Sequence, residues 1–170
     1  TPLDSSSATA RYTSVPRGVN PERASRLNAT AIASMEPEDL ERAAAKGGFK
    51  VQPGDVALIR TGWGRYFALD NAKYLTGEPG PDVAGAKWLI DQGIVAIGAD
   101  NMAVEVLPNP DHTLGLPLHQ YSLSQRGVYL IENLALEELA RDGVSTCCFI
   151  LLATKYRGAT GSPVRPVAMV

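Results

Sequence analysis

Two histidines and one glutamate near the middle of the chain could carry chemistry. His112 and His119 are the two histidines of the 170-residue sequence, and Glu132 closes a short apolar run at residues 128–131. An imidazole and a carboxylate together suit a divalent cation such as Zn²⁺ or Mn²⁺. His119 and Glu132 lie 13 positions apart, so they are not neighbours on one helix. They can meet if His119 lies on a loop above the end of the strand that leads into Glu132.

The same residues also fit an ordinary structural role. A catalytic zinc site usually takes three protein ligands plus water, and His119 with Glu132 provides two. On spacing alone, an ordinary histidine and a strand-end glutamate is the plainer interpretation. His112 lies in an Asn-Pro-Asp-His loop, and we expect its side chain to be exposed.

The surrounding pattern predicts an α/β fold that brings strand ends together. Strands are expected at 56–60 and 94–97, because the apolar runs at 56–59 and 94–97 are typical of buried strands, and a helix is expected between them at 81–92. A strand–helix–strand order predicts at least one parallel pair. Trp63 and Asp100 follow the two strands, so both are candidate substrate-binding residues at the sheet edge. The alternatives are a core tryptophan and an aspartate that caps a helix or an Asx turn.

The remaining elements complete a single α/β domain over residues 34–170. Residues 1–33 carry little pattern and are expected to form a loop or extended arm, or the remnant of a missing N-terminal part. Glu105 fits either the pocket or a turn. Further elements are expected at these positions: helices at 34–46 and 134–140, a proline-rich loop at 107–117 and strands at 128–131, 147–153 and 164–170.

Composition excludes several classes of function. A formal net charge of −2 leaves no excess of positive charge for nucleic acid. The apolar runs are too short to span a bilayer, and nucleophile-elbow, H-E-x-x-H, P-loop and dinucleotide motifs are all missing from the sequence.

Cys147 and Cys148 are neighbours in a predicted strand, where their side chains point to opposite faces and do not form a disulfide. Two buried thiols and the lack of a signal-peptide pattern lead us to expect a cytoplasmic protein.

Several segments, in order, resemble one family. The segments are PGDVALIRTGW at 53–63, VAIGADNMAVE at 95–105, LPLHQ at 116–120, GVYLIENL at 127–134 and GATGSPVRPVA at 158–168. PEDLERAA at 37–44 fits the helix that usually precedes them. Together they resemble the later part of the cyclase family of metal-dependent hydrolases, which includes bacterial kynurenine formamidase and isatin hydrolase.

The resemblance implies a swivelling β/α/β-type fold with a mixed sheet flanked by helices, often in a dimer. It also implies a centre of one or two Zn²⁺ or Mn²⁺ ions. By position, His119 matches the family's late histidine ligand and Glu132 its late glutamate ligand, and Trp63 would lie near the substrate. The family reaction is attack of metal-activated water on an amide, lactam or lactone carbonyl.

One family motif is missing. The motif H-x-G-T-H-x-D-x-x-x-H supplies most of the family's metal ligands and its catalytic histidine, and this sequence has no histidine before His112. Asp4 and Glu22 are the carboxylates of residues 1–33 and cannot replace the motif. The catalytic residues are therefore unknown, and the fold is expected to be incomplete without an N-terminal portion.

Three explanations remain open: one piece of a split or cleaved enzyme, an incomplete gene, or a degenerate homologue. We expect a metal-dependent hydrolase of a small amide, lactam or lactone that is inactive as this chain alone. Its partner would be a second copy or a complementary N-terminal chain. The alternatives are a metal-free binding or partner subunit and a ring-forming enzyme of natural-product synthesis.

Overall fold

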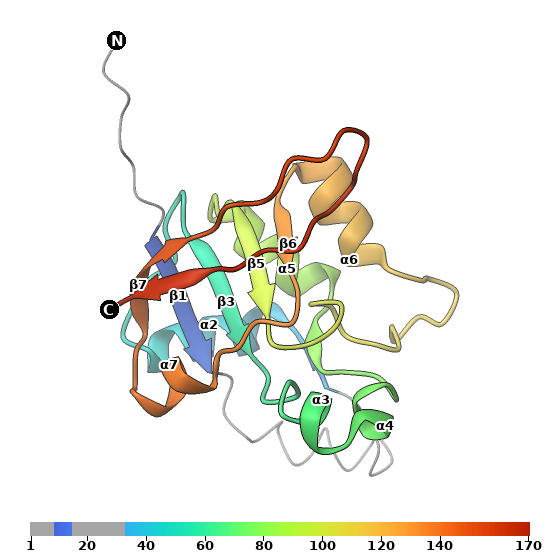
Figure 1. The fold of residues 1–170 in the computed structure, drawn as a ribbon, viewed down its shortest axis with the longest axis horizontal. Helices are drawn as coiled ribbons and strands as arrows, with labels where there is room; N and C mark the ends of the chain where they lie inside the picture. Colours follow the sequence, from blue (N-terminus) through green and yellow to red (C-terminus); the bar gives the residue numbers. More distant parts are fainter. Residues whose placement is uncertain (1–8, 15–32) are drawn as a thin grey trace.

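The main sheet is mixed and has a parallel half. The computed structural model describes residues 9–14 and 33–170. Within them, the strands of the main sheet run in the order β6-β5-β3-β1-β7-β8 (Figure 1). These strands are β1 (Thr9–Ser14), β3 (Val56–Arg60), β5 (Ala96–Ala99), β6 (Tyr129–Ile131), β7 (Thr146–Ile150) and β8 (Val167–Met169). Strands β6, β5, β3 and β1 are parallel, whereas β7 and β8 each run antiparallel to the preceding strand in the sheet.

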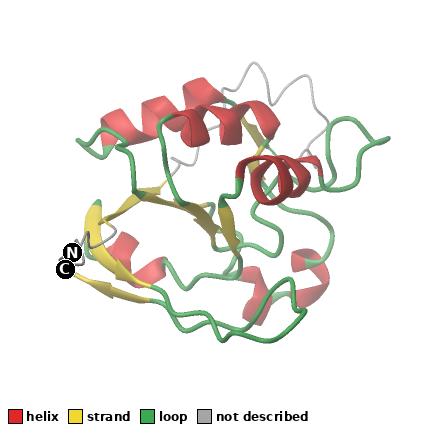
Figure 2. Ribbon diagram, turned by 90° about the horizontal axis from the view of Figure 1, so that it is seen from above, coloured by secondary structure: helices red, strands yellow, loops and turns green. Residues whose placement is uncertain are grey.

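The helices lie on both faces of this sheet. In Figure 2, α2 and α5 cover one face, and α7 lies on the other with the C-terminal segment. Two short strands, β2 (Ser34–Met35) and β4 (Gly80–Pro81), pair separately. The helices are α2 (Pro37–Lys46), α3 (Tyr66–Leu69), α4 (Asn71–Tyr74), α5 (Val83–Asp91), α6 (Pro117–His119), the π-helical segment η1 (Gln120–Arg126) and α7 (Glu137–Arg141). Across the described ranges, every helix is too short or too polar to cross a lipid bilayer.

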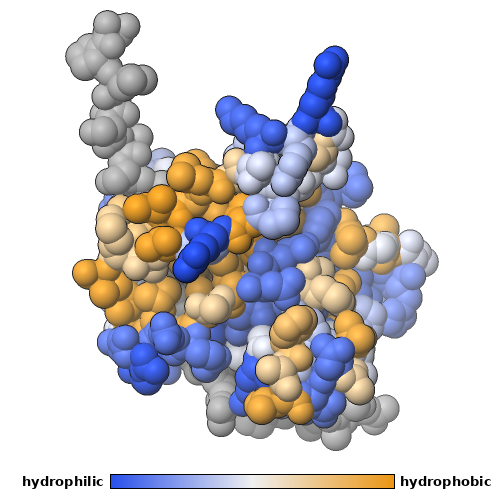
Figure 3. Space-filling view, in the orientation of Figure 1, coloured by the Kyte–Doolittle hydropathy of each residue, from blue (hydrophilic) through white to orange (hydrophobic). Residues whose placement is uncertain are grey.

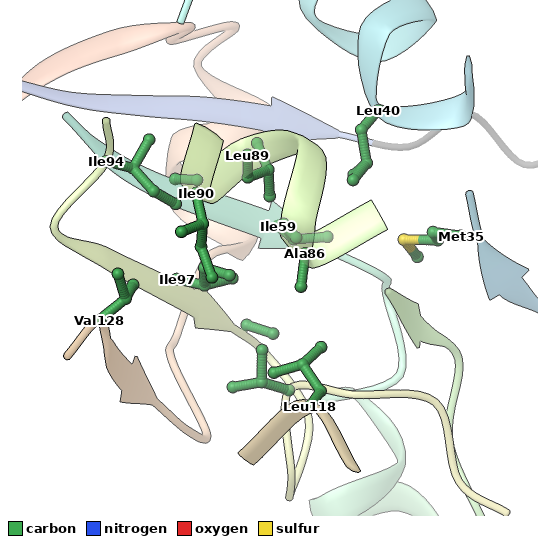
Figure 4. Packing of buried hydrophobic residues seen from close by; sticks show 13 residues of the cluster. Met35, Leu40, Ile59, Ala86, Leu89, Ile90, Ile94, Ile97, Leu118 and Val128 are labelled. Carbon is green, nitrogen blue, oxygen red and sulfur yellow. The ribbon is translucent and has the colours of Figure 1, made fainter. Parts of the chain in front are cut away.

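Each face of the sheet has its own apolar core. On the helical face, α2 and α5 pack onto the inward residues of β3 and β5, and Leu118 of α6 joins them (Figure 4). On the opposite face, α7 and the segments around Leu151 and Val164 pack against β3, β5 and β7. Alternate residues of β3 therefore serve different cores: Ala57 and Ile59 face α5, and Leu58 faces the C-terminal side.

Local signals fix where the two long helices begin. Glu36 and Asp39 form a reciprocal capping box at the start of α2, where Pro37 occupies the first turn. The Asp82 carboxylate accepts a hydrogen bond from the Gly85 N–H at 2.8 Å and so caps α5.

Most of the expected elements are found, with shifts at their ends. The strand at 56–60 matches β3, and the predicted parallel pair is confirmed as β3 and β5, which α5 connects. The predicted helix at 34–46 begins at residue 37, because residues 34–35 pair with β4 instead. Cys147 and Cys148 are both free, as expected.

Two expectations are wrong. Residues 9–14 form β1 between β3 and β7 and not the expected loop or extended arm. The alternative, a remnant of a missing N-terminal part, stays a prediction, and the rest of the 1–33 segment lies outside the described residues except for Ala33. Residues 117–126, expected as loop and polar segment, are helical in α6 and η1. The segment packs through buried Leu118, and the residues that follow it are mostly polar. The sequence therefore lacks the regular spacing of apolar residues that would predict a helix here.

We predict that Ile97→Ala lowers the free energy of unfolding by about 2–5 kcal/mol, because it leaves a cavity in the helical-face core. Ile97 is 0% exposed, whereas Val95 in the same segment is 44% exposed. Urea unfolding followed by circular dichroism measures the change, with Val95→Ala as the matched control. Equal losses in the two variants would show that Ile97 is not a core residue.

Candidate functional site

Three neighbouring parallel strands end at one edge of the sheet, and a candidate residue follows each end. Trp63 lies in the loop after β3, Asp100 directly follows β5 and Glu132 directly follows β6. The strand order places β3, β5 and β6 side by side. Ligands of open α/β sheets bind beyond such carboxyl ends. The fold therefore brings the sequence-predicted residues to one edge.

His119 and Glu132 face each other at this edge. His119 is the last residue of α6, where the helix continues into η1, and its Nε2 lies 3.4 Å from Oε1 of Glu132. The His119 side chain is 19% exposed and that of Glu132 is 43% exposed. Because both side chains are partly exposed, the pair is open to solvent on the side where a ligand could enter. His119 also borders the π-helical segment η1, and π-helical turns often occur at functional sites. His112 is exposed, as expected.

A buried carboxylate holds His119 from behind. Glu105 Oε1 lies 2.7 Å from His119 Nδ1, and the Glu105 residue is 1% exposed. The same carboxylate accepts hydrogen bonds from the backbone N–H groups of Leu118 at 3.2 Å and His119 at 3.1 Å. Glu105 thus fixes both the ring and the backbone of His119, and it leaves Nε2 directed at Glu132.

The two carboxylates strongly favour the protonated form of His119. The hydrogen bond to Glu105, followed by that to Glu132, raises the pKa of His119 from 6.5 to about 9, against the opposing effect of burial. At neutral pH, in the absence of a metal, the imidazolium bridges the two carboxylates. A cation that bound Nε2 would displace this proton.

Asp100 positions the loop that carries Trp63. Its carboxylate accepts hydrogen bonds from the Thr61 N–H and hydroxyl at 2.8 and 2.7 Å and from the Gly62 N–H at 2.8 Å. Asp100 is 4% exposed. A side chain on Gly64 would collide with the Asp100 carbonyl oxygen, its Cβ only 2.4 Å away. These contacts describe a structural role, and direct contact of Asp100 with substrate stays a prediction.

Trp63 is held in place by Tyr74. The Trp63 Nε1–H donates to the Tyr74 carbonyl at 3.2 Å. The Tyr74 hydroxyl donates to Asn133 Oδ1, next to Glu132. Tyr74 is 2% exposed, and burial raises its pKa to about 12, so it stays a neutral donor. Sequence reasoning missed Tyr74, since nothing near it in sequence marks a buried hydroxyl.

Glu78 is another buried carboxylate, and sequence reasoning missed it. It is 0% exposed and accepts hydrogen bonds from the backbone of Met102 and Ala103 at 2.8 and 2.7 Å. Burial raises its pKa despite these bonds. The loop it supports contains Val104 with φ 64, a strained value for a β-branched residue. Glu78 therefore fixes the loop that leads from β5 to Glu105.

An apolar recess between α2, α5 and β3 is distinct from this edge. Leu40, Ala44, Trp88 and Leu89 are among the residues that line it. It shares no lining residue with the His119–Glu132 pair and has almost no polar surface. It belongs to the helical-face core.

The His119–Glu132 pair fits part of a metal centre. Imidazole nitrogen and carboxylate oxygen are the donors that Zn²⁺ and Mn²⁺ accept, and the Glu105 carboxylate behind the imidazole is a typical second-layer partner. Within the described part of the chain, no group of three or more His, Cys, Asp and Glu side chains is arranged to hold a metal ion. The described residues thus offer two candidate ligands and not a complete set.

Comparison with known proteins gives the family. The model of the family named Cyclase ("Putative cyclase") matches residues 16–106, more than half of the sequence. This chain belongs to the cyclase family. No curated protein matches it.

Solved structures share the fold. The structure of a novel cyclase has a TM-score of 0.76 and 29% identity, and the match covers 95% of this chain and 53% of that one. An isatin hydrolase bound to the product analogue thioisatinate has a TM-score of 0.75 and 21% identity, covering 96% and 60%. A potential metal-dependent hydrolase with cyclase activity has a TM-score of 0.63 and 18% identity, covering 95% and 64%. The chain therefore spans less than two thirds of the length of these structures.

We predict that His119 titrates near pH 9 in the metal-free chain, and that Glu105→Gln lowers its midpoint, because the largest cause of the raised pKa is removed. Heteronuclear NMR of the imidazole in the presence of EDTA measures both values. An unchanged midpoint in Glu105→Gln would contradict the assigned cause.

The same shift makes stability depend on pH. The stabilisation from protonated His119 is fully present below its usual pKa of 6.5 and is lost as pH rises through about 9; it is on the order of 3 kcal/mol. Urea unfolding near pH 6 and near pH 9.5 should show this loss in the native sequence and not in His119→Gln. An equal loss in both proteins would exclude His119 as its source.

Proposed function

We propose that this chain contributes His119 and Glu132 to the divalent-metal site of a hydrolase that acts on a small amide, lactam or lactone. The observation that carries the proposal is the approach of His119 Nε2 to Glu132 at 3.4 Å, with Nδ1 held by buried Glu105. Structures with this fold include an isatin hydrolase and a potential metal-dependent hydrolase. Their names support the reaction class, and the facing pair supports the ligand assignment.

The protein groups have separate roles in this proposal. Glu105 accepts the Nδ1–H of neutral His119 and so keeps the Nε2 lone pair directed at Glu132. Glu132 supplies an anionic oxygen that remains accessible to solvent. A bound Zn²⁺ or Mn²⁺ would polarise the carbonyl and lower the pKa of a water molecule. Trp63, held by Tyr74, would contact the substrate, and Asp100 keeps the Trp63 loop in place.

The remaining ligands lie outside this sequence in the proposal. The family motif H-x-G-T-H-x-D-x-x-x-H does not occur in these 170 residues. A complementary N-terminal chain or a second copy would supply the missing groups. Free thiols at Cys147 and Cys148 suit a reducing compartment, which supports the cytoplasmic location expected from sequence.

A metal-free binding or partner subunit of the same fold is the second candidate. It is favoured by the lack of a three-ligand group among residues 9–14 and 33–170. The two candidates differ in their response to added metal. A partner subunit would show the same thermal midpoint with and without Zn²⁺ or Mn²⁺, whereas a ligand that binds the native state raises it.

We predict that the isolated chain binds Zn²⁺ weakly and that His119→Ala or Glu132→Ala weakens binding at least about tenfold, since each removes one of two ligands. Isothermal titration calorimetry at neutral pH measures the affinity. His112→Ala is the matched control, because it removes an exposed imidazole elsewhere. The ligand assignment fails if His119→Ala binds as tightly as the native chain or if His112→Ala has the larger effect.

Activity requires a complementing chain in this proposal. The isolated protein is expected to leave formyl-kynurenine, isatin and simple lactones intact. Adding a polypeptide that carries the H-x-G-T-H motif, with Zn²⁺ or Mn²⁺, should produce hydrolysis of one of them. Failure on all three classes by a metal-loaded complex would overturn the hydrolase proposal.

A further inference from the structure

Two cations converge on one phenol beside the proposed site. Arg65 Nη2 and Lys73 Nζ donate to the Tyr66 hydroxyl at 2.8 and 3.0 Å. They also lie close to the Tyr66 ring, with Arg65 Cζ at 4.7 Å and Lys73 Nζ at 4.1 Å from its centroid. Asp70, the nearest carboxylate in sequence, accepts a hydrogen bond from the Lys73 backbone and caps α4. Among the described residues, neither Arg65 nor Lys73 forms an ion pair with a carboxylate.

This arrangement leaves two positive charges on one neutral acceptor. Like charges so close together repel, and an anion between them would relieve the repulsion. The Tyr66 O–H would be a third donor to that anion. The pKa of Tyr66 is lowered from its usual value by Lys73 and then by Arg65, which reflects the same positive potential. Hydrogen bonds between charged groups are shorter and stronger than neutral ones, so the three donors suit a carboxylate.

Aromatic and apolar surface lies next to the two cations. The Trp63 ring packs edge-on against Tyr66, with centroids 5.0 Å apart, and Lys73 Nζ lies 5.9 Å from the Trp63 ring. Phe67 is 63% exposed and Leu75 is 61% exposed. Figure 3 shows apolar and polar side chains interleaved over α3 and α4. A ligand that combines a flat apolar ring with a negative charge fits this surface.

Hydrogen bonds connect this surface to the proposed site. Trp63 donates to the Tyr74 carbonyl, and the Tyr74 hydroxyl donates to Asn133, the residue after Glu132. The α3–α4 region therefore borders the edge of the sheet where Glu132 lies. A ligand held by Arg65 and Lys73 could keep its ring against Trp63 on the side of that edge.

We propose that Arg65, Tyr66 and Lys73 bind the carboxylate of an aromatic ligand whose ring packs against Trp63. As a statement about substrate, this inference rests on the proposed hydrolase function. Hydrolysis of an aromatic lactam or lactone breaks the acyl C–N or C–O bond, and the oxygen of water forms a new bond to the carbonyl carbon. The leaving nitrogen or oxygen takes one proton, and the acid loses the other to solvent. The ring-opened product thus carries a carboxylate that the substrate lacked, whereas hydrolysis of an aryl formamide releases the new carboxylate as formate and leaves none on the aromatic product.

The test compares benzoate with benzamide, its neutral isostere, by isothermal titration calorimetry on the full chain in EDTA at low ionic strength. Benzoate should bind the native chain and benzamide at least about tenfold more weakly, since it lacks the charge. The double variant Arg65→Gln, Lys73→Gln should lose a similar factor for benzoate. Both side chains are exposed, so the variant should unfold at the same temperature as the native chain.

The control Lys50→Gln, Arg157→Gln removes the same two charges from exposed positions elsewhere. It should bind benzoate as the native chain does. The proposal is overturned if benzoate and benzamide bind equally, if Arg65→Gln, Lys73→Gln has no effect, or if the control weakens binding as much. Because EDTA removes metal ions, this result does not depend on whether the chain binds Zn²⁺ or hydrolyses any substrate.

Discussion

The candidate site depends on the hydrogen bonds that the buried carboxylate of Glu105 accepts. An anion with 1% exposure must be hydrogen-bonded, because burial without partners costs several kcal/mol. Glu105 meets this need with the backbone of Leu118, the backbone of His119 and the His119 ring. The same bonds join the loop after β5 to the start of the helical segment at residue 117. The direction of His119 is therefore a consequence of how Glu105 is satisfied.

The sequence predicted best where a pattern reflects burial on both sides of a sheet. The predicted strand at 56–60, with its continuous apolar run at 56–59, became β3 with the expected ends, and the predicted strand at 94–97 became β5 with a shift of two residues. The predicted order of strand and helix was enough to place Trp63 and Asp100 after neighbouring strands, whereas the position of Glu132 depends on β6, which pairs in parallel with β5. His119 and Glu132 approach each other as the metal hypothesis requires, but His119 lies at the end of a helix and not on the expected loop.

Long-range polar contacts could not be predicted. The buried Glu78 carboxylate accepts hydrogen bonds from backbone N–H groups more than twenty residues away in sequence. No local sequence pattern distinguishes it from a solvated glutamate. Tyr74 meets Asn133 across 59 positions. The η1 segment carries one buried polar residue, Ser122, where an apolar stripe would have signalled a helix. These positions depend on tertiary structure, which local propensity does not contain.

Strand β1 has a consequence for how the protein is made. It pairs with β3 on one side and, through residues 9–11, with residues 146–148 of β7 on the other. A ribosome must therefore synthesise residues 146–148 before this side of β1 can be paired. Until then the free side of β1 offers unpaired backbone groups to any other extended polypeptide. Contacts between segments so far apart in sequence also form slowly, so newly made protein is expected to benefit from a chaperone during this interval.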